Sequence, residues 1–244
     1  MTRFKSKRNS VYLSDGTVKK TVSDAAAANL EAEYLCKLKA DNVAVPEVLD
    51  VVENTLCLQY IPGDTLPDFL AKNPSEAELT AAAEGLAAWF ADFYQITNND
   101  VISTKASNAS EAEKSQHLSH SPSASQPPLY LRGEFSAFTH NPTLQTPNSK
   151  LIPIRGDVNG RNFIIYDGKW YGVDFEKYCF GAKEEDAGRL LAFANTYSLS
   201  DRKMQEYFVS VLKKSLIDNL RLESARVEYF FENELEAMRL RRNL

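Results

Sequence analysis

The sequence predicts an α+β protein with two lobes, a small β-rich N-lobe over residues 1–60 and a mainly helical C-lobe over residues 61–244. Two observations predict this class. Before Pro62-Gly63, short strand-like runs surround one Ala-rich helical segment, and after it the apolar residues recur with helical spacing. Strands and a helix packed on one small sheet, followed by helices, form an α+β arrangement.

Local signals predict the elements of the N-lobe in order. Residues 10–22 contain an apolar run, an Asp-Gly turn and an alternating run, which predicts a β-hairpin. Asp24 is placed to cap a helix over residues 25–40, a segment rich in Ala, Leu and Glu. Two further strands are expected over residues 43–52 and 56–61.

The C-lobe opens with a helix and is then interrupted. Ser75 and Glu78 form a capping-box pattern ahead of an apolar-periodic helix over residues 79–94. Residues 98–149 include a stretch of Ser, Ala, Pro, Asn and Gln with too few large apolar side chains to offset its ordering entropy, so we expect a mobile insertion there. The remaining predicted elements are a strand over residues 151–154, a hairpin over 163–173 and helices over 185–197, 201–219 and 225–241.

Charge and composition limit the partners and the compartment. The net charge is -5 and the pI is about 5.4, so the chain offers no field that would collect nucleic acid or an anionic membrane surface. Its three cysteines match neither a disulfide framework nor a zinc site, which indicates a reducing compartment. No signal peptide is visible, and no apolar run approaches the roughly 20 residues that span a bilayer. We expect a cytoplasmic protein without nucleic-acid or membrane partners.

The residues that indicate chemistry lie in and after the segment 154–165. Asp157 follows a predicted strand, and Asn162 comes at the start of the next strand. The hairpin that follows places a second carboxylate, Asp174, at the end of its return strand. Phosphoryl transfer needs a carboxylate that takes the acceptor's proton and hard oxygen ligands that hold Mg²⁺ against the phosphates. This spacing of Asp, Asn and Asp therefore favours a kinase-type site over an ordinary Gly-Asp turn.

These motifs resemble those of the aminoglycoside phosphotransferase and choline kinase group of the protein-kinase-like superfamily. Arg155-Gly156-Asp157 with Asn162 is similar to its His-Gly-Asp-x-x-x-x-Asn catalytic loop, and Val173-Asp174-Phe175-Glu176 to its metal-binding segment. The resemblance implies that Asp157 is the catalytic base, and that Asn162 and Asp174 hold Mg²⁺. Asp186 would then brace the catalytic loop. Arg155 replaces the family's usual His, which orients the loop, so the departure concerns efficiency more than identity.

The same resemblance assigns the phosphate-binding part of the N-lobe. Ser6 and Asn9 lie in a Ser-containing turn that resembles the family's phosphate loop, although it has no glycine and also fits a flexible surface turn. The third strand carries Lys19 and Lys20, one of which would contact the α- and β-phosphates of ATP. Strand alternation places Lys20 on the face of its apolar neighbours, so we favour Lys20.

Two further N-lobe assignments complete the predicted nucleotide site. Glu31 on the following helix is the expected partner of Lys20, with Glu33 as the alternative. The strand and hinge resemblance implies that backbone groups of Gln59, Tyr60 and Ile61 receive the adenine edge.

The sequence thus predicts an ATP-dependent phosphotransferase with ATP and Mg²⁺ as cofactors. The acceptor would be a hydroxyl of a small molecule or of a protein. The alternative is a pseudokinase-like module that binds nucleotide without turnover, which the glycine-free phosphate loop and Arg155 favour and the complete Asp, Asn, Asp set disfavours.

Overall fold

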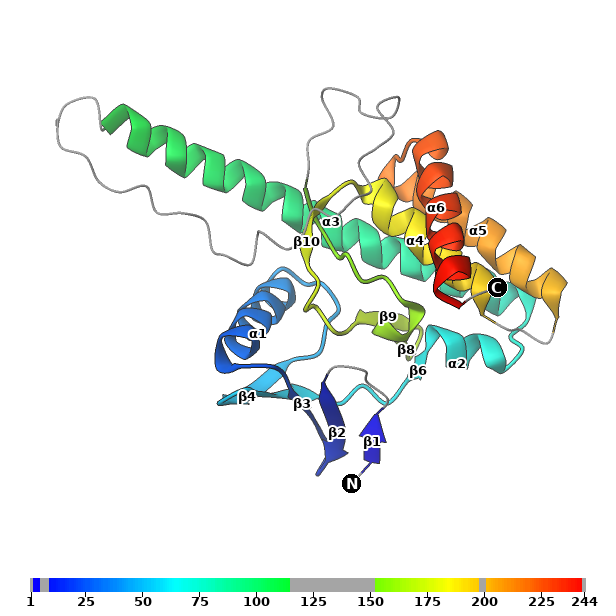
Figure 1. Cartoon of the computed structure of the whole chain (residues 1–244), viewed down its shortest axis with the longest axis horizontal. Coiled ribbons are helices and arrows are strands. Elements are labelled where there is room, and N and C mark those ends of the chain that lie inside the picture. The colour runs from blue at the N-terminus through cyan, green and yellow to red at the C-terminus, as the bar shows by residue number, and fades with distance from the viewer. Residues whose placement is uncertain (1, 5–8, 115–151, 198–200, 243–244) are drawn as a thin grey trace.

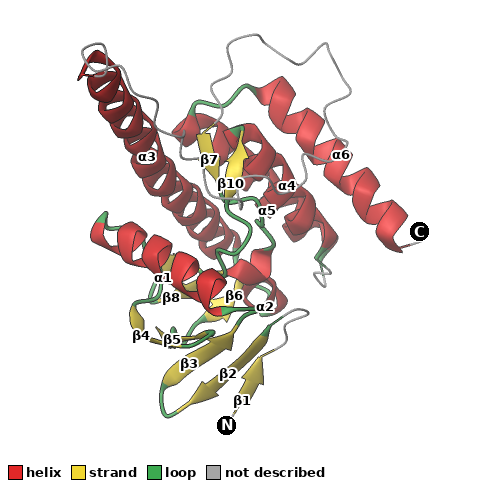
Figure 2. Ribbon diagram, turned by 60° about the vertical axis from the view of Figure 1, so that its left-hand side comes forward, coloured by secondary structure: helices red, strands yellow, loops and turns green. Residues whose placement is uncertain are grey.

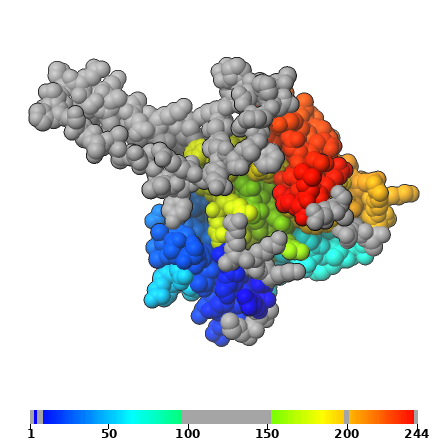
Figure 3. Space-filling model, viewed as in Figure 1, coloured from blue at the N-terminus to red at the C-terminus, as the bar shows by residue number. Residues whose placement is uncertain are grey.

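The computed structural model describes residues 2–4, 9–114, 152–197 and 201–242. A β-rich N-terminal part is followed by a mainly helical part, which confirms the predicted α+β class. In the space-filling view the N-terminal sheet and the C-terminal helices lie at opposite ends, with the segment after residue 152 between them (Figure 3). The boundary at residue 60 stays a prediction.

The N-terminal part is one antiparallel sheet with the order β1-β2-β3-β5-β4. One helix, α1, lies over a face of this sheet (Figure 2). The predicted hairpin and helix are confirmed, and the Asp24 carboxylate caps α1 by accepting a hydrogen bond from Ala27 N at 2.8 Å. The elements are β1 (Thr2–Phe4), β2 (Ser10–Ser14), β3 (Thr17–Thr21), α1 (Ala25–Ala40), β4 (Val48–Val52) and β5 (Thr55–Gln59).

One predicted strand is shorter than expected. We expected it to start at residue 43, but β4 begins at Val48. Val43 and Val45 are buried as irregular backbone, and Pro46 cannot donate a ladder hydrogen bond. The apolar run therefore enters the core without pairing to a neighbouring strand.

The C-terminal part contains two small sheets and five helices among the described residues. The helices pack in pairs, α3 against α5 and α4 against α6. No helix among the described residues is long and apolar enough to cross a membrane. The elements are β6 (Asp64–Thr65), α2 (Leu66–Ala71), α3 (Glu76–Lys114), β7 (Ile152–Ile154), a 3-10 turn (Gly160–Asn162), β8 (Phe163–Tyr166), β9 (Lys169–Gly172), β10 (Cys179–Gly181), α4 (Lys183–Thr196), α5 (Arg202–Leu220) and α6 (Ser224–Arg242).

Helix α3 confirms the predicted capping box and is longer than predicted. The Glu78 carboxylate accepts hydrogen bonds from the backbone N and the hydroxyl of Ser75, at 2.8 and 2.7 Å. The helix continues to Lys114, into the range 98–149 where we expected a mobile insertion. Residues 115–151 lie outside the described part of the chain, so the insertion stays a prediction.

The Ala44 carbonyl is one of the groups that join the N-terminal part to the helical core. The Ala44 carbonyl accepts hydrogen bonds from the Trp89 indole N–H at 2.8 Å and from Gly172 N at 3.0 Å. Trp89 is buried and stacks on Phe93 with ring centroids 5.5 Å apart. A Cβ atom at Gly172 would lie 2.3 Å from the Trp89 ring, so only glycine permits this approach.

Gly172→Ala should therefore destabilise the protein by about 1–3 kcal/mol, because the added methyl group overpacks the Trp89 contact. Gly85→Ala is the matched control. Its added Cβ would meet Trp170 at 3.3 Å, and the exchange gains helix propensity within α3. Urea unfolding measures both, and equal losses of stability in the two variants would contradict this account of the joint.

Candidate active site

The predicted catalytic residues lie on one loop between β7 and β8. Asn162 ends the 3-10 turn directly before β8, and its side-chain amide donates to the Asp157 carbonyl at 3.3 Å. The backbone N of Val173, at the end of β9, donates to the Asn162 carbonyl at 2.9 Å. These bonds place Asp174 beside the loop that carries Asp157 and Asn162.

Asp186 on α4 fixes the start of this loop. Its side chain is fully buried, and its two oxygens accept hydrogen bonds from Arg155 N at 2.7 Å, Gly156 N at 3.0 Å and the Tyr94 hydroxyl at 2.7 Å. Burial raises the pKa of Asp186, and the three donors counteract that rise. The carboxylate thus holds the loop backbone, which is the bracing role that the resemblance implied.

Arg155 occupies the position of the family's usual His and is also buried. Its guanidinium carbon lies 3.9 Å from the centroid of the Phe175 ring. One terminal nitrogen, Nη2, donates to the carbonyls of Val173 and Asp174, the latter at 3.0 Å. Its Nε and Nη1 have no hydrogen-bond partner among the described residues. Burial lowers the pKa of Arg155, and the nearby carboxylates of Asp174 and Asp157 oppose this.

The backbone at Asp174 is in the left-handed region, with φ 64°. Residues other than glycine adopt this region rarely, although Asp and Asn tolerate it better than most. Arg155 donates hydrogen bonds to the carbonyls of both Val173 and Asp174, so it stabilises this turn. The position of the Asp174 carboxylate therefore depends on Arg155.

Lys20 joins the N-terminal sheet to this turn. Its side chain is 6% exposed, and its ammonium lies 2.8 Å from a Glu31 oxygen, 2.7 Å from Asp174 Oδ1 and 2.9 Å from Glu176 Oε1. Burial alone would lower the pKa of Lys20, but the carboxylates of Glu31 and Asp174 raise it above its ordinary value. Glu31 also accepts a hydrogen bond from Phe175 N at 3.1 Å. The ammonium therefore stays charged in a group with more carboxylates than cations.

The predicted base, Asp157, also has a cationic partner. Lys177 Nζ lies 2.7 Å from Asp157 Oδ2. Burial by itself would raise the pKa of Asp157, but the Lys177 ammonium, the Asn159 backbone N–H and Arg155 together lower it below the ordinary value. The Asp157 carboxylate is thus ionised at neutral pH.

The structure separates the alternatives left open for the N-lobe. Lys20 is buried and paired with Glu31, whereas Lys19 faces the other side of β3 and Glu33 is exposed. Asn9 donates a hydrogen bond to Glu176 and so lies beside the same group of carboxylates. Ser6 lies outside the described residues. The roles of these residues toward ATP stay predictions.

At the predicted adenine hinge, two backbone groups already have partners. Gln59 N donates to the Glu47 carbonyl at 2.8 Å, and the Ile61 carbonyl accepts from Gly63 N at 2.9 Å. The backbone of Tyr60 between them is not engaged by these bonds. The adenine contacts of Gln59, Tyr60 and Ile61 stay a prediction.

The site also contains residues that sequence reasoning missed. Lys177 was one of them, although its place directly after the predicted metal-binding segment is a signal for it. Tyr197 was another: its hydroxyl accepts a hydrogen bond from Gly160 N at 2.7 Å and lies 3.3 Å from the Asn159 side chain. No local pattern marks a tyrosine at the end of a helix as a support for a distant loop.

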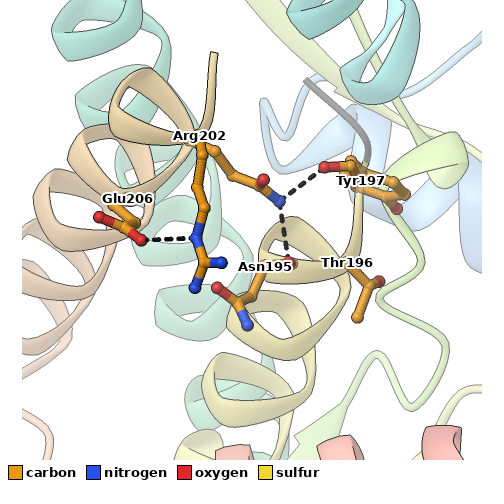
Figure 4. Close-up of a pocket in the computed structure, with 6 residues that line it drawn as sticks. Asn195, Thr196, Tyr197, Arg202 and Glu206 are labelled. Carbon is orange, nitrogen blue, oxygen red and sulfur yellow. Dashed lines mark hydrogen bonds and ion pairs between the residues drawn. The ribbon is translucent and has the colours of Figure 1, made fainter. Parts of the chain in front are cut away.

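A pocket of about 310 Å³ borders this support between the end of α4 and the start of α5 (Figure 4). Arg202 and Glu206 form an ion pair at 2.9 Å on its wall, and the Gln205 amide donates to the Tyr197 carbonyl at 2.6 Å. Its lining includes none of Lys20, Asp157 or Asp174, so it is separate from the group described above. The lining residues are Asn195, Thr196, Tyr197, Arg202, Gln205 and Glu206.

The residues present fit a divalent cation that arrives with phosphates. Lys20 is surrounded by three carboxylates, so the group has an excess of negative charge. Asn162 donates through its amide nitrogen, which leaves its amide oxygen as a hard ligand near Asp174. Among the described residues no cluster of three or more His, Cys, Asp or Glu forms a complete metal cage. Mg²⁺ is usually held by few protein oxygens together with substrate phosphates, and this donor set suits it.

No protein-family model matches the chain, and no curated protein matches its sequence. Its fold, however, is similar to that of solved aminoglycoside phosphotransferases and of an amicoumacin kinase. This is the fold that the resemblance to the aminoglycoside phosphotransferase group implied.

Three solved structures illustrate this similarity. Aminoglycoside phosphotransferase APH(3'')-Id from Streptomyces rimosus is 17% identical with a TM-score of 0.60, covering 96% of this chain and 90% of that one. APH(2'')-Ib with bound ADP is 14% identical with a TM-score of 0.53, covering 89% and 80%. Amicoumacin kinase hAmiN in complex with AMP-PNP, Ca²⁺ and Ami is 13% identical with a TM-score of 0.55, covering 92% and 74%. The TM-scores establish the fold. Identities this low leave the activity to be argued from the site.

Asp186→Asn should destabilise the protein by about 2–3 kcal/mol, because an amide offers one acceptor oxygen where the buried carboxylate serves three donors. Asp218→Asn is the control, since that side chain is 62% exposed on α5 and should change stability by less than about 0.5 kcal/mol. Chemical unfolding measures both, and a neutral Asp186→Asn would show that the loop does not depend on this carboxylate.

Proposed function

We propose that the chain is an ATP-dependent phosphotransferase that moves the γ-phosphoryl group of ATP to a hydroxyl of a small molecule. The observation that supports it most is the contact of Lys20 with both Glu31 and Asp174. It brings a cation of the N-terminal sheet to a carboxylate beside the Asp157 loop. A lysine for phosphates, a metal-binding carboxylate and a base in one place are the parts that phosphoryl transfer uses.

ATP would bind between the sheet and the catalytic loop. The adenine edge would meet the backbone near Tyr60, and the α- and β-phosphates would meet Lys20, with Asn9 and Ser6 contributing from the phosphate loop. Lys20 would exchange its bond to Asp174 for bonds to phosphate oxygens, while Glu31 keeps its ammonium oriented. The raised pKa of Lys20 keeps it protonated for this purpose at neutral pH.

The metal would be Mg²⁺ held by Asn162 and Asp174. When bound, it supplies charge neutralisation of the β- and γ-phosphates. The protein contributes the placement of these two ligands, through the Val173–Asn162 backbone bond and through the contacts of Arg155 with the Asp174 turn. Arg155 thus takes the orienting place that His usually has in the family.

Asp157 would orient the acceptor hydroxyl and take its proton. Its lowered pKa means that the carboxylate is ionised over the neutral range. The acceptor oxygen then attacks the γ-phosphorus, and the bond from that phosphorus to the β–γ bridging oxygen breaks. Positioning and charge stabilisation supply the rate enhancement in this chemistry.

A small-molecule acceptor is favoured over a protein, because solved structures with this fold are titled as complexes with streptomycin or amicoumacin. These ligands are bound by those solved phosphotransferases, and the acceptor of this chain is left to the experiment below. A cytoplasmic location is also part of the proposal, since ATP is available there and the described cysteines are all free thiols.

The deciding experiment combines binding with turnover. A rise in melting temperature on addition of ATP and Mg²⁺, followed by ADP release in a screen of hydroxyl compounds, would support the enzyme. ATP binding without ADP release for any acceptor or water would instead support a pseudokinase-like module. No nucleotide-dependent shift would overturn both.

Lys20→Ala should weaken ATP binding about ten-fold or more, whereas Lys19→Ala should leave it nearly unchanged, because only Lys20 faces the carboxylate group. Calorimetric titration with ATP measures both. Lys20→Ala also leaves Glu31 buried without its partner, so Lys20→Met combined with Glu31→Gln provides a second variant with a neutral pair. A larger loss in Lys19→Ala would contradict the assignment.

Asp174→Asn should abolish the gain in ATP affinity that Mg²⁺ provides over EDTA, because the metal-bound form uses the carboxylate as its charged ligand. Asp167→Asn is a matched control, since Asp167 also has a positive φ, 50° against 64°, but lies in the β8–β9 turn. If Mg²⁺ strengthens ATP binding equally in both variants, Asp174 is not a metal ligand.

A further inference from the structure

The ion pair between Lys177 and Asp157 brings a second lysine into the site. Lys177 comes from the segment after Asp174, not from the catalytic loop, and its ammonium lies 2.7 Å from Asp157 Oδ2. Its side chain is 53% exposed, against 23% for Asp157. An exposed pair of this kind contributes about 0–1 kcal/mol to stability, so stability alone gives little reason for its place.

The backbone that carries Lys177 is held on two sides. Gly156 has φ 73°, and a Cβ atom there would lie 2.3 Å from the Lys177 carbonyl oxygen, so the catalytic loop approaches this segment as closely as glycine permits. On the other side the Tyr178 ring packs on Tyr34 of α1 with centroids 4.2 Å apart. Lys177 is therefore a flexible side chain on a fixed backbone, directed at the predicted base.

The geometry of transfer puts a phosphoryl group within reach of this ammonium. If Asp157 accepts the acceptor's proton, the acceptor oxygen lies about 3 Å from its carboxylate. The γ-phosphorus lies next to that oxygen in line for attack. The Lys177 ammonium, 2.7 Å from Asp157 Oδ2, is then near the equatorial oxygens of the γ-phosphoryl group.

Lys20 is not placed to serve those oxygens. It is 6% exposed and is held by Glu31 as well as by Asp174. Charge in phosphoryl transfer develops on the equatorial oxygens and moves toward the bridging oxygen of ADP. A second, mobile cation beside the acceptor would stabilise the negative charge on the equatorial oxygens.

We propose that Lys177 is a further catalytic residue, which binds the γ-phosphoryl group in ATP and during its transfer; this rests on the proposed function. The acceptor hydroxyl oxygen forms the new bond to the γ-phosphorus, and its proton goes to the Asp157 carboxylate. The bond to the bridging oxygen breaks, and its electron pair stays on ADP. Lys177 remains protonated throughout and exchanges part of its contact with Asp157 for the equatorial oxygens.

The test compares ATP with ADP, since only ATP has the γ-phosphoryl group. In Lys177→Gln the dissociation constant for ATP with Mg²⁺ should rise about ten-fold, and that for ADP should not change. Lys177→Arg keeps the positive charge and should retain most of the preference for ATP over ADP. The rate of ADP release, with water as acceptor, should fall about 100-fold in Lys177→Gln. Lys169→Gln, an exposed lysine on β9, is the control for net charge.

The outcomes separate this inference from the function on which it rests. If the wild-type chain binds ATP and releases ADP, but Lys177→Gln loses affinity for ATP and ADP equally, or for neither, the inference is overturned and the phosphotransferase stands. If ATP preference falls only in Lys177→Gln while ADP release is absent in every variant, Lys177 binds the γ-phosphoryl group but does not act in transfer, and the catalytic role is overturned. If the wild-type chain binds neither nucleotide, both proposals fall. An unchanged melting temperature in each variant establishes that the comparison is between folded proteins.

Discussion

The site depends on a buried ammonium that cannot remain buried without its carboxylates. Removing a charge from water costs several kcal/mol, and the cost is offset only by close pairing. Lys20 is paired with Glu31 of α1 and with Asp174 after β9, so its ammonium holds a strand, a helix and the Asp174 turn together. The same pairing leaves an excess of negative charge, which a cation and the positive side chains around phosphates would balance.

The catalytic loop depends on a second buried charge with a different purpose. Asp186 accepts from two consecutive backbone N–H groups of the loop, and Arg155, whose own N–H is one of them, extends to the Asp174 turn. Helix α4, the loop and the turn are therefore linked through one residue. A buried arginine in this place has an advantage over a histidine, since it carries its charge at any physiological pH. Its Nε and Nη1 have no hydrogen-bond partner among the residues that the structure describes, and the cation–π contact of the guanidinium with Phe175 compensates part of that loss.

Much of this arrangement could be predicted from the sequence, because local chemistry determines it. The cap at Asp24, the α1 boundaries and the burial of Lys20 follow from capping, propensity and strand alternation. The start of the strand expected at residue 43 could not be predicted in this way, because its first apolar residues enter the core as irregular backbone. The Ala44 carbonyl accepts a hydrogen bond from Trp89 and not from a neighbouring strand of the N-terminal sheet. Periodicity reports that a residue is buried and does not report which backbone partner it has.

Contacts between distant segments account for what sequence reasoning missed. Lys177 and Tyr197 reach the loop that carries Asp157 from a turn and from a helix end. Only Lys177 has a signal in the sequence, its place directly after the segment of Asp174. Both act on residues around Asp157, one on its carboxylate and the other on the backbone of Gly160. The pattern Asp, Asn, Asp therefore predicts the chemistry of the loop, whereas the side chains that approach it from elsewhere determine how the loop is held. Those approaching residues are where this chain can differ from other proteins with the same fold.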